Sequence, residues 1–162
     1  MLVGIMSDSH DYMPRIRAAI KTFIDAGAGA VIHAGDFISP LTFDCFKGLD
    51  VPFHAVFGNN DGEKFLLRAR FAPLGQIHER FCKTGIAGRR FIITHENDVV
   101  DSLARSGDYD VVVYGHSHGI DLRRLGGTLV VNPGEVCGWL SGRSTAALLD
   151  TDSLDVRIVD LA

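Results

Sequence analysis

The stretch LVGIMSDSHDYMPRIRAAIKTFIDAGAGAVIHAGD, residues 2–36, decides the fold of this chain. It begins with a short apolar run at 2–6, which is typical of a buried strand. Apolar residues at helical spacing follow over 13–26, with a proline in the first turn and Gly27 as the stop. A second apolar run at 30–34 is the next strand. The stretch therefore predicts a β-α-β unit.

The rest of the chain continues this alternation and then becomes rich in strands. The expected helices are 40–48, 62–71 and 98–106. Asp61 is placed to cap the second of them, and Asn97 or Asp98 to cap the third. The expected strands are 53–57, those within 77–94, 110–115, 120–125, 128–131, 144–150 and 154–159. About ten strands are too many for one twisted sheet. We therefore predict the α/β class with two packed mixed β-sheets and helices outside, a four-layer α/β/β/α sandwich.

Size and composition narrow the class of protein. A chain of 162 residues with 46 % apolar residues favours one globular domain spanning 1–162. The net charge of -4 argues against stable nucleic-acid binding, which needs clustered Lys and Arg. Three separated cysteines without a CxxC motif, and a start that lacks a signal-peptide pattern, predict a cytoplasmic protein. Since no apolar run is long enough to cross a membrane, no membrane partner is expected.

Seven polar residues that can bind metal ions follow predicted strands. They are Asp8, His10, Asp36, Asn59, His95, His116 and His118, in the motifs SDSH, HAGD, GNND, ITHE and YGHSH. In open α/β sheets, ligands bind beyond the carboxyl ends of the strands, and neighbouring strands lie about 4.8 Å apart. Two ions of a hydrolytic pair lie about 3.5–4 Å apart. If these strands are neighbours, their loops can supply ligands to both ions.

Each motif alone also has a simpler explanation. Asp8 could cap the first helix, and Gly35-Asp36 is a common turn pair. Asn59 could belong to a turn before a helix, and His95 could be a buried core histidine with satisfied hydrogen bonds. The order DxH, GD, GN, TH and GHxH, each at a strand end, is much more specific than any one motif. We therefore interpret the seven residues as one site for two borderline divalent ions.

With these motifs the chain resembles the calcineurin-like metallophosphoesterases, and more narrowly their small single-domain bacterial and archaeal phosphodiesterases. The resemblance covers essentially the whole length, from Asp8 to NPGE at 132–135 and the closing strands. It implies that one metal is bound by Asp8, His10, Asp36 and His118, and the other by Asp36, Asn59, His95 and His116, with Asp36 shared. The family carries manganese, iron, zinc, nickel or cobalt. We expect two divalent transition-metal ions, with manganese as the first candidate.

The expected activity is hydrolysis of a small-molecule phosphodiester. A water shared by two metal ions is acidified, and the resulting hydroxide attacks phosphorus in line. Two alternatives stay open: a phosphomonoesterase that uses the same metal pair, and a non-catalytic protein-interaction scaffold of the same fold. Trp139 and Leu140 could line the substrate site or contact a second subunit, so a homo-oligomer also stays open.

Several positions depart from the wider family. Many members carry His after the motif Asn, where it can protonate the leaving alkoxide, but this chain has Asn60. Because Asn cannot act as an acid at neutral pH, we expect Asn60 to contact phosphate and alkyl esters to react more slowly than aryl esters. Asp61 either orients a metal-binding His or caps the following helix. Glu135 stands where the family often has Ser, and Glu96 and Asn97 replace a Gly-His pair.

Overall fold

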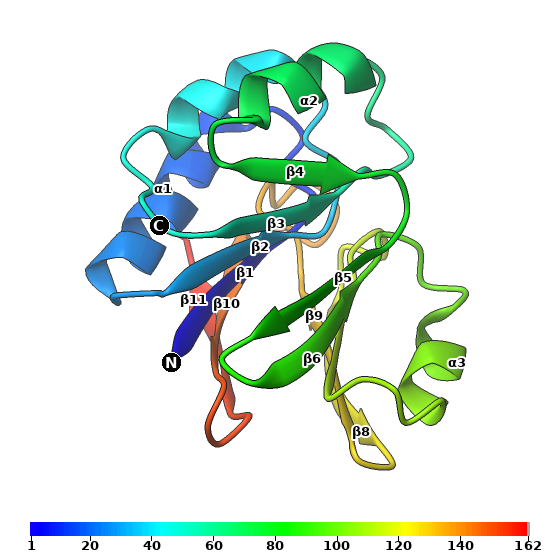
Figure 1. Cartoon of the computed structure of the whole chain (residues 1–162). Coiled ribbons are helices and arrows are strands. Elements are labelled where there is room, and N and C mark those ends of the chain that lie inside the picture. Colours follow the sequence, from blue (N-terminus) through cyan, green and yellow to red (C-terminus); the bar gives the residue numbers. More distant parts are fainter. Residues whose placement is uncertain (162) are drawn as a thin grey trace.

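In this computed structural model, which describes residues 1–161, the strands form two sheets packed face to face (Figure 1). The first sheet has six strands in the order β11-β10-β1-β2-β3-β4. Their bounds are Leu2–Met6 for β1, Ala30–His33 for β2, Phe53–Val56 for β3, Gly75–His78 for β4, Thr145–Asp150 for β10 and Val156–Asp160 for β11. Strands β1 to β4 run parallel, whereas β10 pairs antiparallel with both β1 and β11, so the sheet is mixed.

The second sheet has five strands in the order β5-β6-β7-β9-β8. Their bounds are Cys82–Ile86 for β5, Arg89–Ile93 for β6, Val111–Val113 for β7, Ile120–Leu125 for β8 and Thr128–Pro133 for β9. Strands β6, β7 and β9 run parallel, and β5 and β8 pair antiparallel at the two edges. The predicted Gly126-Gly127 turn joins β8 to β9, since Leu125 pairs with Thr128 across it.

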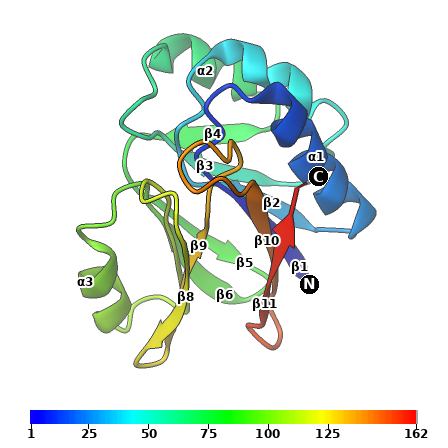
Figure 2. The same cartoon turned by 180° about the vertical axis from the view of Figure 1, so that it is seen from behind.

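Helices cover the outer faces of both sheets, which gives the predicted four layers (Figures 1 and 2). Helix α1 (Met13–Asp25), the 3-10 helix η1 (Pro40–Phe46) and α2 (Lys64–Phe71) lie on the first sheet, and α3 (Val100–Arg105) lies on the second. Alternate residues of one strand therefore enter different cores. In β6, Phe91 and Ile93 pack between the sheets, whereas Ile92 packs with α3. The α/β/β/α sandwich predicted from the pattern is confirmed.

The predicted helix ends were less accurate. The short helix expected at 40–48 is a 3-10 helix, and α2 and α3 each begin about two residues later than expected, without a side-chain cap. The caps predicted at Asp61, Asn97 and Asp98 are therefore wrong, because Glu63 and Val99 occupy the N-cap positions. Within residues 1–161, no helix is long and apolar enough to span a bilayer. The single domain predicted for 1–162 stays a prediction, and residue 162 lies outside the described residues.

The carboxyl ends of the parallel strands of both sheets meet at one side of the molecule. After β9, the backbone amides of Val136 and Cys137 donate to the carbonyls of Ser7 and Asp8, which follow β1. Within the second sheet, Gly115, after β7, donates to the carbonyl of His95, after β6. The hydrogen bonds from Val136 and Cys137 join the loops of the first sheet to those of the second, and the polar motifs of the sequence lie in these loops.

Candidate metal centre

The seven residues predicted as metal ligands lie together at these strand ends. Asp8 and His10 follow β1, Asp36 follows β2, Asn59 follows β3, His95 follows β6, and His116 and His118 follow β7. Contacts of 2.9 to 3.5 Å connect them in the order His10, Asp36, His95, Asn59, His116, Asp8 and His118. The structure thus brings all seven into one cluster, although they are spread over more than a hundred positions of the sequence.

Asp36 lies at the centre of the cluster and is 1 % exposed. Its Oδ2 atom lies 3.4 Å from His10 Nε2 and 3.5 Å from His95 Nε2, so one carboxylate faces histidines on two sides. Asn60 holds this carboxylate in place, because its backbone amide donates to Oδ1 at 2.9 Å and its side-chain Nδ2 donates to Oδ2 at 2.8 Å. This geometry fits a carboxylate that is shared between two cations.

One half of the cluster consists of Asp8, His10, Asp36 and His118. A ligand atom of each lies within 4.8 Å of the ligand atoms of the others. The Nε2 atom of His10 is buried and makes no hydrogen bond with any group of residues 1–161. Burial raises the pKa of the Asp8 carboxyl above its usual value, because its charge is removed from water. An unpartnered imidazole nitrogen beside two buried carboxylates is an arrangement that a divalent cation stabilises.

The other half is built around Asn59, whose Oδ1 atom lies 2.9 Å from both His95 Nε2 and His116 Nδ1. His95 Nδ1 lies 2.7 Å from the carbonyl oxygen of Ala34. Since a carbonyl only accepts, Nδ1 carries the proton of a neutral His95 and leaves Nε2 as a lone pair. That lone pair faces oxygens of Asn59 and Asp36 with no proton between them, so this half also fits a cation.

The backbone of the site is unusual for residues with side chains. Asp8, His10, Asp36, His116 and His118 all have φ between 42° and 67°, the left-handed region. Two glycines let the loops approach closely. A Cβ at Gly58 would collide with the Asp36 carboxylate, and a Cβ at Gly115 would collide with the Ser7 hydroxyl. The sequence motifs GN and GH thus contain glycine because there is no room for a side chain.

Asp61 has a role that differs from both predicted ones. Its carboxylate accepts hydrogen bonds from the backbone amides of Asp36, Ile38 and Gly58 at 2.7 to 3.1 Å. The predicted contact to a metal-binding histidine is therefore replaced by backbone contacts. Burial raises the pKa of Asp61, and the charge is stabilised by these amides. Asp61 connects the loop after β2 to the loop after β3, so it fixes the position of Asp36 relative to Asn59.

Glu135 is a residue of the site whose role the sequence did not reveal. It is 0 % exposed, follows β9, and accepts a 2.6 Å hydrogen bond from His118 Nδ1. It also accepts hydrogen bonds from Cys137, Leu140 and Ser141. Burial alone would raise the pKa of Glu135, but its hydrogen bonds, that from Cys137 first, outweigh burial and lower the pKa to about 2. The signal in the sequence was an acid where the family often has Ser, inside a glycine-containing loop.

The segment between β9 and β10 is orange in Figure 2. It carries Trp139, whose ring lies beside that of His10 at the rim of the site. Trp139 is 62 % exposed. Its ring centroid lies 5.9 Å from that of His10 and 6.1 Å from that of Tyr12. Trp139 thus lies beside a predicted metal ligand while most of its ring is uncovered, so both roles considered for it, lining the substrate site and contacting a second subunit, stay open.

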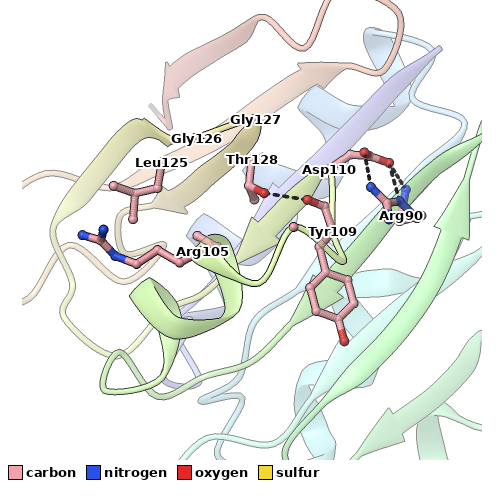
Figure 3. Close-up of a pocket in the computed structure, with 10 residues that line it drawn as sticks. Arg90, Arg105, Tyr109, Asp110, Leu125, Gly126, Gly127 and Thr128 are labelled. Carbon is pink, nitrogen blue, oxygen red and sulfur yellow. Dashed lines mark hydrogen bonds and ion pairs between the residues drawn. The ribbon is translucent and has the colours of Figure 1, made fainter.

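Two cavities differ in their relation to the cluster. One of about 370 Å³ borders Asn59 and His95 and is also lined by Lys64, Arg80, Glu96 and Asp98, among others. Another, of about 510 Å³, lies between α3 and the β8–β9 hairpin (Figure 3). Its Arg90 is paired with Asp110 at 2.9 Å, and none of the seven predicted ligands lines it. Of these two cavities, only the first lies beside predicted metal ligands.

The fold and this cluster define a class of protein: metal-binding α/β/β/α sandwiches whose site lies at the joined ends of two mixed sheets. Residues 1–154 match the Calcineurin-like phosphoesterase superfamily domain, and the chain belongs to this family. Membership implies divalent metal ions, and the cluster of Asp and His side chains is a suitable site for them.

Known relatives agree with this assignment over the full length. A phosphodiesterase of Methanocaldococcus jannaschii is 40 % identical over an alignment of 165 positions, which covers 99 % of this chain and 99 % of that one. A solved structure of an archaeal phosphodiesterase has a TM-score of 0.94 at 40 % identity and covers 99 % of this chain and 100 % of that one. Vps29 of Entamoeba histolytica in complex with Zn²⁺ shares the fold alone, with a TM-score of 0.68 at 18 % identity and 100 % coverage of both chains.

Proposed function

We propose that this protein is a metal-dependent phosphodiesterase that hydrolyses a small-molecule phosphodiester. The observation that carries the proposal is the cluster of seven Asp, Asn and His side chains around the Asp36 carboxylate. The relative from Methanocaldococcus jannaschii, 40 % identical over nearly the whole chain, is named a phosphodiesterase, which supports the same activity here.

In this proposal the seven residues bind two divalent ions. Asp8, His10, Asp36 and His118 hold one ion, and Asp36, Asn59, His95 and His116 hold the other. When bound, such a pair supplies Lewis-acid chemistry and lowers the pKa of a water molecule. Two carboxylates do not neutralise two divalent ions, so the centre stays positive toward phosphate. Imidazole donors favour manganese, iron, cobalt, nickel or zinc over calcium, and manganese is the first candidate.

The residues of the chain have separate tasks in this reaction. Asn60 fixes the shared Asp36 carboxylate with its backbone amide and one side-chain N–H, and the second N–H of its amide group is available to a phosphate oxygen. His95 keeps its proton on Nδ1 through Ala34, so it presents a bare nitrogen to the site. Because no imidazole stands at position 60, the leaving group departs without an acid there, which favours aryl over alkyl leaving groups.

The surroundings of the site suit a substrate with two ester arms. The cavity beside Asn59 and His95 has room for one arm, and Trp139 stands on the side of His10. The net charge of -4 makes a nucleic acid an unsuitable partner. We place the protein in the cytoplasm, which keeps its three buried cysteines reduced. The exposed Trp139 and Leu140 leave a homo-oligomer as a further proposal.

The test compares bis(p-nitrophenyl) phosphate with p-nitrophenyl phosphate, with Mn²⁺ added or with all metal removed by a chelator. We expect Mn²⁺-dependent hydrolysis with a preference for the diester. A preference for the monoester would identify a phosphomonoesterase, and inactivity on both compounds with metal bound would identify a scaffold. Asp36→Asn should abolish activity and reduce the bound metal. The exposed Asp44→Asn on η1 is the matched control and should behave as the wild type.

A further inference from the structure

Glu135 receives hydrogen bonds from two parts of the molecule that have different tasks. Its Oε2 atom accepts from His118 Nδ1 at 2.6 Å and from Cys137 Sγ at 3.0 Å. Its Oε1 atom accepts from the backbone amide of Leu140 at 3.0 Å and from the Ser141 hydroxyl at 2.7 Å. The carboxylate is completely buried. One side chain thus connects a predicted metal ligand to the loop between β9 and β10.

The contact with Glu135 determines which nitrogen of His118 can bind a cation. A carboxylate only accepts, so His118 Nδ1 carries the proton. In the neutral ring Nε2 is then a lone pair, and it lies 3.5 Å from Asp8 Oδ1, inside the cluster. If the proton moved to Nε2, the same ring would point an N–H at the cation position. The orientation and the tautomer of His118 therefore both depend on an acceptor behind Nδ1.

The same carboxylate determines where the loop lies. Leu140 and Ser141 follow Trp139 directly, and both donate backbone amides to Glu135. Trp139 itself packs at 5.9 Å from the His10 ring centroid. Glu135, which fixes His118 on one side of the site, thereby also fixes the segment that carries Trp139. All five donors converge on two oxygens, and a neutral amide offers only one acceptor oxygen for them.

We propose that Glu135 is a positioning residue that holds His118 ready for metal binding and locks the 137–141 loop against the site. The proposal rests on the metal-binding function proposed above. It explains why an acid occupies this position. A serine side chain is shorter and has a single oxygen, so it cannot offer separate acceptors to His118 and to the amides of Leu140 and Ser141. The carboxylate satisfies both sides with separate oxygens.

The test uses Glu135→Gln, which keeps the shape of the side chain. The amide must direct its NH₂ group either at His118 or at the loop, so one set of donors loses its acceptor. Facing His118, the NH₂ group forces the ring proton to Nε2. We expect the affinity for Mn²⁺, measured by calorimetric titration of the full chain, to fall about 10- to 100-fold, as is typical when the partner of a metal-binding histidine is removed. Ser141→Ala separates the two sides of the network, since it removes one loop contact and leaves the contact to His118, and Asp44→Asn, remote from Glu135, is the control with wild-type affinity.

A second measurement does not depend on the variant. Nitrogen NMR of the metal-free wild-type protein reports the tautomer of His118, and we expect the proton on Nδ1. A proton on Nε2 would overturn the proposal even if Glu135→Gln failed to fold. Wild-type Mn²⁺ affinity in Glu135→Gln would overturn it as well. Absence of Mn²⁺ binding by the wild type would contradict the proposed function itself, so the two failures are distinguishable.

Discussion

At the scale of single residues, Asn60 is the clearest difference between this site and that of many family members. Its side-chain amide donates to Asp36 at 2.8 Å and its backbone amide at 2.9 Å, so it supports the shared carboxylate from outside. An imidazole at the same position would supply an acid to the leaving group, whereas the Asn60 side chain supplies a second donor to Asp36. The residue at position 60 therefore affects both which leaving groups react and how the Asp36 carboxylate is held.

This leads to a prediction for Asn60→His. We expect the ratio of kcat/KM for a dialkyl phosphodiester to that for bis(p-nitrophenyl) phosphate to rise about tenfold or more, because general acid catalysis matters most for poor leaving groups. Asn60→Ala is the control and should lower both rates without changing their ratio. An unchanged ratio in Asn60→His would mean that protonation of the leaving group does not limit the slow substrates.

The sequence predicted which residues come together better than it predicted the contacts that hold them in place. The seven predicted ligands could be recognised because each follows an apolar strand in a short motif, and the carboxyl ends of such strands meet. Asp61 and Glu135 could not be assigned in this way. Asp61 accepts from backbone amides up to 25 positions away, and Glu135 accepts from His118, 17 positions away. Such contacts depend on how loops fold against each other, which local pattern does not encode.

At the scale of elements, the strands were predicted more accurately than the helices, and the reason is their burial. Parallel strands such as β2 and β7 are buried over their whole length and read as continuous apolar runs. The position of a helix end depends on which polar group accepts the hydrogen bond of each free backbone amide. Asp61 stands three positions before α2, yet it serves other amides, so α2 begins without a side-chain cap. Caps predicted from residue type alone were wrong for this reason.

The β5–β6 hairpin gives a prediction at this scale. Its turn consists of Ala87 and Gly88, both with positive φ, at 48° and 78°. Two-residue turns of this kind favour Asn-Gly, since a residue other than Gly or Asn pays for the left-handed backbone. Ala87→Asn should raise the free energy of unfolding by about 1 kcal/mol in a urea titration. Gly88→Ala should lower it by a similar amount, although no atom lies near enough to clash. A lower free energy of unfolding in Ala87→Asn, or a higher one in Gly88→Ala, would contradict this account.

At the scale of the whole molecule, three hydrophobic cores hold the four layers together. One lies between the helices and the first sheet, one between the two sheets, and one between the second sheet and α3. The number of strands in the sequence predicted this arrangement, because about ten strands are too many for one twisted sheet and two packed sheets need helices on their outer faces. The order of the strands within each sheet was not predictable, since it depends on which strands pair and not on their own pattern.

Burial of weak acids predicts how the stability of the metal-free protein depends on pH. Burial raises the pKa of Cys82 to about 11, of Cys137 to about 12 and of Tyr114 to about 12. Above pH 9 the unfolded chain loses these protons while the folded protein keeps them, so the folded state binds more protons and the free energy of unfolding falls as pH rises. Urea titrations with a chelator present should show this fall between pH 9 and 11.

Cys82→Ala tests the contribution of one group. Cys82 packs between the sheets, away from the cluster, and burial alone shifts its pKa. The variant should lose stability less steeply over the same pH range than the wild type, whatever its stability at neutral pH. Parallel pH profiles for the two proteins would show that this thiol does not contribute.

The left-handed backbone at five of the predicted ligands bears on how related proteins evolve. These residues are Asp8, His10, Asp36, His116 and His118. Each such residue costs about 1 kcal/mol or more that glycine would not. A lineage released from hydrolysis could therefore become more stable simply by drifting to glycine at these places, with no change elsewhere. This chain has kept a residue with a side chain at all five positions, although glycine there would be more stable. Among proteins of this fold, glycine at positions with this left-handed backbone would therefore indicate that hydrolytic activity has been lost, and it could be recognised before any assay is run.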